Sequence, residues 1–99
     1  MEVIPAILES SWSEVAHKIK LVDGFTDWIQ LDISDGIFTP IQTWSNPQEL
    51  LDLNIKSKLE IHLMVADPAE EIKRWLVDPV VRLVVQVESL GNVKPPTFN

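Results

Sequence analysis

Hydrophobic and polar residues largely alternate in two parts of the chain, about residues 27–33 and residues 58–65, which predicts two half-buried β-strands. The apolar positions that share one face of each strand are Ile29, Leu31 and Ile33, and then Leu59, Ile61 and Leu63. The opposite faces carry Gln30 and Asp32 on the first strand and Glu60, His62 and Met64 on the second. A buried charge needs water or a partner, so Asp32 is the first candidate functional residue.

Two apolar runs at the ends of this pattern predict two more strands. They cover residues 3–8, where Pro5 suits an edge strand, and residues 80–87, which are rich in β-branched side chains. Between the strands, apolar residues recur at helical spacing from Trp12 to Val22, and the pair Asp23-Gly24 is typical of a helix end.

Helix-start signals fill the remaining gaps. Ser11 and Glu14 have the spacing of a capping box, and Asn46-Pro47 and Asp67-Pro68 predict the starts of a second and a third helix. The second helix is expected to run through Leu53. The resulting order, strand–helix–strand–helix–strand–helix–strand, predicts an α/β fold with a parallel sheet and right-handed crossovers.

Polar residues collect where the predicted strands end, at Asp32, His62 and Glu88. In parallel α/β proteins the ligand site lies at that end of the sheet. The loop of about ten residues after the second strand, residues 35–44, is long for a compact domain and is a further candidate for function.

Composition excludes several classes of protein. The chain has 99 residues, 45% of them apolar, which is enough for one small core. Its net charge of −7 argues against nucleic acid or an anionic membrane as a partner. It has no cysteine, no basic region before an apolar N-terminal stretch and no apolar run long enough to span a membrane, so we expect a cytoplasmic protein.

Three motifs stand at the ends of predicted strands: Pro5-Ala6-Ile7-Leu8, Asp32-Ile33-Ser34-Asp35-Gly36-Ile37-Phe38-Thr39-Pro40 and Ile61-His62-Leu63-Met64-Val65. Their order and spacing resemble the ribulose-phosphate 3-epimerase family, whose patterns read Pro-Ser-Ile-Leu, Asp-x-Met-Asp-Gly-x-Phe-Val-Pro and x-His-Leu-Met-x. The family folds as a (β/α)₈ TIM barrel. The resemblance therefore implies a parallel βαβαβαβ half of such a barrel.

The resemblance also implies a site. In the family, two histidines and two aspartates hold a divalent metal, and the aspartates move the proton at C3 of a sugar phosphate. By position, Asp32 matches a catalytic and metal-binding aspartate, and His62 matches a metal-binding histidine. Met64 and Ala6 stand at substrate-binding positions. The implied cofactor is a divalent transition metal, zinc, manganese or iron.

Several positions depart from the family pattern. Gln30 replaces the first metal-binding histidine and Ala6 replaces a serine. Ser34, Ile41 and Gln86 replace a methionine, an asparagine and a histidine. The second aspartate and the glycine-rich phosphate loops have no counterpart here. Epimerisation needs an acid/base group on each face of the carbon, so the single chain is expected to be catalytically incomplete.

Structural roles compete with these functional ones. Asp32 could be held by backbone hydrogen bonds, His62 could be a satisfied core residue, and Asp35-Gly36 fits turn chemistry. His17 and the pair Glu70-Glu71 are expected to be solvated. The four tryptophans are expected in the core or at an interface.

A half barrel has open edges at its first and fourth strands, and its inward face is expected to expose Ile, Val and Leu. Both features predict a homodimer or a higher homo-oligomer, with residues 1–90 as the half-barrel domain and residues 91–99 as an exposed tail. Three functional hypotheses stay open: a catalytically incomplete half barrel, an epimerase or isomerase completed by a second chain, and a truncated or engineered fragment of a longer barrel. The absence of an apolar helical period in the tail weighs against the last.

Overall fold

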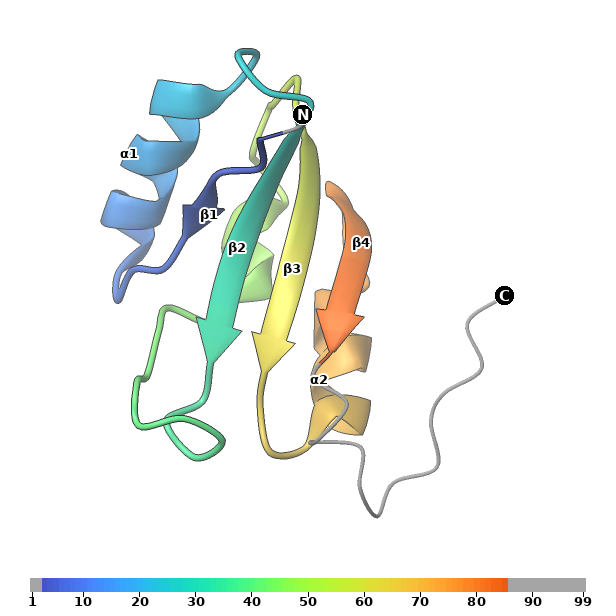
Figure 1. Ribbon diagram of the computed structural model, residues 1–99. Helices are drawn as coiled ribbons and strands as arrows, with labels where there is room; N and C mark the ends of the chain where they lie inside the picture. The colour runs from blue at the N-terminus through green and yellow to red at the C-terminus, as the bar shows by residue number, and fades with distance from the viewer. Residues whose placement is uncertain (1–2, 86–99) are drawn as a thin grey trace.

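The computed structural model describes residues 3–85, which form one four-stranded parallel sheet with helices packed on one side (Figure 1). The elements in chain order are β1 (Ala6–Ile7), α1 (Trp12–Val22), β2 (Trp28–Ser34), the 3₁₀ helix η1 (Pro47–Leu50), β3 (Lys58–Met64), α2 (Pro68–Trp75) and β4 (Val80–Val85). The strand order in the sheet is β1-β2-β3-β4. This arrangement confirms the predicted alternation of strands and helices around a parallel sheet.

Local signals account for the ends of α1. The Ser11 hydroxyl accepts a hydrogen bond from the backbone N–H of Glu14, as the capping-box spacing predicts. The helix ends at Val22, and Gly24 follows with φ of +82°, a conformation that a side chain would strain.

Two elements are shorter than the sequence predicts. The apolar run of residues 3–8 contributes only Ala6 and Ile7 to the sheet. The second helix starts where predicted but ends before Leu53. It is one turn of 3₁₀ helix over Pro47–Leu50, after which the backbone N–H groups of Leu51 and Leu53 each bond a carbonyl only three residues back.

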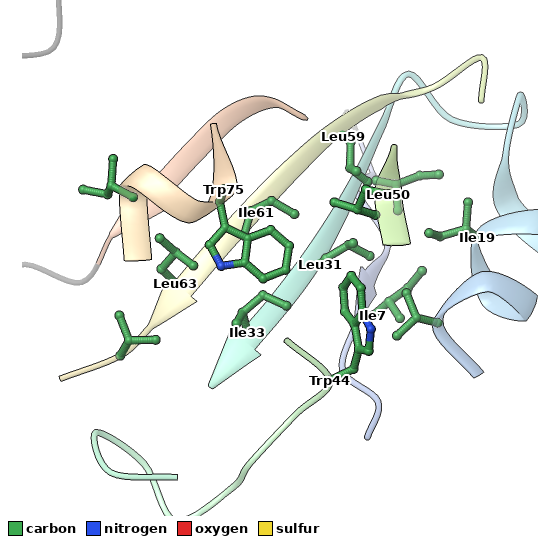
Figure 2. Close-up of a cluster of buried hydrophobic side chains, with 14 residues drawn as sticks. Ile7, Ile19, Leu31, Ile33, Trp44, Leu50, Leu59, Ile61, Leu63 and Trp75 are labelled. Atoms are coloured by element: carbon green, nitrogen blue, oxygen red, sulfur yellow. The ribbon is translucent and has the colours of Figure 1, made fainter. Parts of the chain in front are cut away.

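The hydrophobic core lies between the sheet and the helices (Figure 2). The apolar faces of β2 and β3 are fully buried there, as the alternating pattern predicts. Trp44 stands at the centre of an aromatic row, 5.0 Å from the Trp12 ring and 5.6 Å from the Trp75 ring, the latter edge to face. Three of the four tryptophans therefore serve the core, and Trp28 lies on the other side of the sheet.

The other side of the sheet carries no helix within residues 3–85, and we call it the bare face (Figure 1). Its strand positions are Ala6, Trp28, Gln30, Asp32, Ser34, Lys58, Glu60, His62, Met64, Arg82 and Val84. The expectation that this face exposes Ile, Val and Leu is wrong for β2 and β3, because their residues of that kind all pack against the helices. The bare face is mainly polar and charged.

No helix within the described residues is long and apolar enough to cross a membrane. His17 is exposed on α1 and Glu70 is exposed on α2, as predicted, whereas Glu71 is half-buried and hydrogen-bonds Arg74 and Trp75. Gln86, Glu88 and the predicted tail of residues 91–99 lie outside the described residues.

Candidate functional site

The bare face brings Asp32, His62 and Gln30 together near the C-terminal ends of β2 and β3. Asp32 and His62 are register partners on these adjacent strands. The Asp32 Oδ1 atom lies 3.3 Å from His62 Nδ1, and Gln30 Nε2 donates a 2.6 Å hydrogen bond to the same oxygen. The side chains of Asp32 and His62 are 17% and 19% exposed, so both are reachable from solvent. Asp32 and His62 therefore lie side by side, as their predicted places at the ends of neighbouring strands imply.

Two neighbours share one oxygen of Asp32, because Oδ1 accepts the N–H of Gln30 Nε2 and also contacts His62 Nδ1. Histidines that bind metals usually donate their other N–H to a carboxylate or a carbonyl, and the Asp32–His62 pair has that form. The amide NH₂ group of Gln30 donates a hydrogen bond to Asp32, whereas a metal ion would need an atom with a lone pair at this position.

We tested whether these residues fit a divalent metal. Within residues 3–85 no group of three or more histidine, aspartate or glutamate side chains converges on one point. Asp32 and His62 supply two donors, whereas zinc sites in proteins use three or four protein ligands. The described part of a single chain therefore does not fit the metal that the family resemblance implies.

A second polar cluster lies nearer the N-terminal ends of the strands, and sequence reasoning missed it. Glu60 is only 4% exposed, and its Oε1 atom accepts a 2.5 Å bond from Arg82 Nε. The Arg82 guanidinium carbon lies 4.0 Å from the ring centroid of Trp28, and Lys58 Nζ lies 5.4 Å from it. The buried carboxylate is therefore neutralised by a guanidinium that also stacks on an aromatic ring.

The sequence placed Glu60 on the bare face but gave no partner for it. Arg82 reaches it because the pairing of β3 with β4 shifts by one residue between Leu59 and Glu60, which makes Val81 an extra residue of β4. A register shift of this kind has no local signal in a run of β-branched residues.

Asp35 organises the loop after β2 and has the turn role that its sequence predicts. Its Oδ1 atom accepts the backbone N–H groups of Ile37 and Phe38, at 2.8 and 3.0 Å, and Oδ2 accepts that of Ala66 at 2.8 Å. Partial burial raises the pKa of Asp35, but these backbone hydrogen bonds outweigh it, and the pKa lies below its ordinary value. Asp35 therefore binds the loop to the segment after β3.

The loop of residues 35–44 is held by further hydrogen bonds. The Ser34 hydroxyl bonds that of Thr39 at 2.7 Å, and the Ser34 N–H donates to the Thr43 hydroxyl at 2.9 Å. Ile41 is 49% exposed. These hydrogen bonds give the loop a defined shape directly after β2.

The predicted substrate-binding residues both lie on the bare face. Ala6 pairs with Gln30 and is exposed, and Met64 is the last residue of β3, half-buried and paired with Ser34. Their placement agrees with a site at this face, and their role in binding stays a prediction.

A parallel sheet whose strands follow one another in order, with crossovers on one side and polar groups on the other, defines a segment of a (β/α) barrel. The sequence of residues 2–96 matches the model of the ribulose-phosphate 3 epimerase family, so the chain belongs to that family. Its sheet corresponds to half of the family's TIM barrel.

Three relatives show the extent of the likeness. The chain is similar to ribulose-phosphate 3-epimerase of Synechocystis, with 33% identity over 73 residues. It is 31% identical over 74 residues to the cytoplasmic isoform of ribulose-phosphate 3-epimerase of Oryza sativa, and 25% identical over 68 residues to ribulose-phosphate 3-epimerase of Rhodobacter capsulatus. The matches cover 72%, 73% and 67% of this chain and only 32%, 32% and 30% of the relatives.

Proposed function

We propose that this chain is a half barrel of the epimerase family that assembles with a second copy and does not epimerise a sugar phosphate by itself. One observation carries the proposal: Gln30 donates to Asp32 from the position where a metal-binding histidine would stand. Asp32 is therefore held by an amide and an imidazole, and the charge that a metal would supply to an enediolate is missing. The name of the rice relative supports a cytoplasmic location.

A direct assay tests the missing activity. Purified chain is incubated with ribulose 5-phosphate and formation of xylulose 5-phosphate is measured, with Asp32→Asn as the matched control. We expect no turnover above that of the control, with or without added manganese or zinc. Turnover by the wild-type chain that Asp32→Asn abolishes would overturn the proposal.

Gln30→His tests the reason for the missing activity. This variant replaces the hydrogen-bond donor beside Asp32 with an imidazole, giving Asp32 and His62 a third metal ligand. We expect calorimetric zinc binding by Gln30→His that is at least tenfold tighter than that of the wild type. Equal zinc affinity of the two proteins would refute the role given to Gln30.

A second candidate is an epimerase or isomerase whose site is completed by a partner chain. The contact between Asp32 and His62 at the C-terminal ends of the strands favours it. Two such pairs, one from each chain, would offer four donors to a transition metal. This hypothesis requires zinc or manganese to raise the melting temperature of the wild type and not that of Asp32→Ala, and it fails if neither ion does so.

A further inference from the structure

The sheet ends in two strands that each have one unpaired side within the described residues. β1 and β4 are the outer strands of the order β1-β2-β3-β4, and each pairs only with its inner neighbour. An open strand edge presents backbone donors and acceptors to any chain that can extend the sheet.

Pro5 does not block the edge at β1. Its carbonyl accepts a 2.9 Å bond from the N–H of Gln30, so the backbone of Pro5 faces β2. Successive residues of a strand direct their backbone groups to opposite sides, which turns those of Ile4 and Ala6 to the open side. The missing N–H of proline is therefore on the paired side, and the open edge keeps its donors.

Both edges are apolar, unlike edges that are protected by charge. The side chains of Val3 and Leu8 beside β1 are 69% and 40% exposed, and those of Val81 and Val84 in β4 are 59% and 38% exposed. Residues 3–8 hold no charged side chain, and Arg82, the one charge in β4, is bound to Glu60. The bulge at Val81 protects only the start of β4.

We infer that β4 of one copy pairs in parallel with β1 of a second copy, and that the two-fold axis repeats this contact to close an eight-stranded barrel. The inference rests on the proposed function and adds to it the surface and the geometry of the assembly. Two identical half sheets joined in this way leave no open edge.

The polar character of the bare face favours edge pairing over stacking of two sheets. A sheet stacked on the bare face at about 10 Å would bury Asp32 and His62 with little water, at a high desolvation cost. Edge pairing instead turns the bare faces into a barrel lumen. All strands then run in one direction, so Asp32 and His62 of both copies lie at the same mouth, which remains open to solvent.

Engineered cysteines test the contact directly, because the native chain has none. Leu8→Cys and Val84→Cys are prepared as separate full-length proteins, mixed and treated with a short bis-maleimide. We expect a cross-linked species that contains one copy of each variant. The control pairs Leu21→Cys with Val84→Cys, since Leu21 is 62% exposed near the C-terminal end of α1 and is not part of a strand.

Sedimentation equilibrium of the wild type completes the test. We expect a mass of two chains of 11.2 kDa, and a monomer for the charged double variant Leu8→Lys/Val84→Lys with unchanged circular dichroism. A wild-type monomer would overturn both this inference and the assembly stated in the proposed function, whereas a dimer in which Leu8→Cys and Val84→Cys do not cross-link would overturn the β4–β1 geometry alone. Equal cross-linking in the Leu21 control would also overturn that geometry. None of these results bears on the missing turnover, which is measured separately.

Discussion

Substituting Asp35 by asparagine tests how the loop beside the site is held. The Asp35 carboxylate accepts three backbone N–H groups, and Asp35→Asn keeps the size of the side chain but replaces one acceptor oxygen by an NH₂ group. That group would face the N–H of Ala66 or those of Ile37 and Phe38, and so leave at least one donor without a partner.

The magnitude follows from the number and exposure of these bonds. A hydrogen bond to a charged group contributes about 1.5–3 kcal/mol when buried, and Asp35 is only half-buried, so water replaces part of the loss. We expect Asp35→Asn to lower the free energy of unfolding by about 1.5 kcal/mol at pH 7. For a domain of this size that corresponds to a fall in Tm of roughly 6–12 °C.

The effect should depend on pH in a defined direction. The pKa of Asp35 is lower in the folded chain than in the unfolded chain, so its stabilising contribution is fully present above the unfolded value of about 3.9. It is lost as pH falls through the lower folded value. The difference between wild type and variant should therefore shrink below about pH 4.

Urea unfolding followed by tryptophan fluorescence, at pH 7 and at pH 3 and at one protein concentration, measures both effects. The control is Asp52→Asn, which removes the same charge from an exposed position after η1. This control matters because the chain carries a net charge of −7, so removal of one negative charge relieves part of its self-repulsion. Equal stability of the two variants at pH 7, or an undiminished gap at pH 3, would refute the reasoning.

Three further predictions concern other contacts of the fold. Asp23 binds the ends of two loops, and its pKa is lowered chiefly by the backbone N–H of Ser57. Asp23→Ala should lower the free energy of unfolding by about 1–2 kcal/mol at pH 7. In urea titrations this effect should weaken below about pH 4. Trp75 is fully buried, and Trp75→Ala should lower the free energy of unfolding by about 3–5 kcal/mol in the same assay. Trp75→Phe should retain most of the wild-type free energy of unfolding. Arg82→Met leaves Glu60 buried without its cation and should lower the free energy of unfolding by about 2–3 kcal/mol. In a double-mutant cycle, the double variant with Glu60→Gln should recover most of that loss.

The sequence placed Asp32 and His62 at the C-terminal ends of predicted strands, and the structure brings these two residues together. Parallel strands end at one edge of the sheet, so Asp32 and His62 had to lie near each other once both were placed at the ends of neighbouring strands. The hydrogen bond from Gln30 to Asp32 was not predictable in the same way. It depends on the rotamers of two side chains on one face, which the alternating pattern does not specify.

The order of the elements, the apolar faces of β2 and β3, the cap of α1 and the turn role of Asp35 could all be predicted from the sequence. Each of these follows from periodicity or from hydrogen bonds between residues close in the chain. Tertiary contacts were needed to show that the helices cover the apolar face and leave the polar face bare, that Glu60 meets Arg82 over the Trp28 ring, and that the second helix is a single 3₁₀ turn. These features depend on strand register and on contacts between distant segments, so no local pattern encodes them.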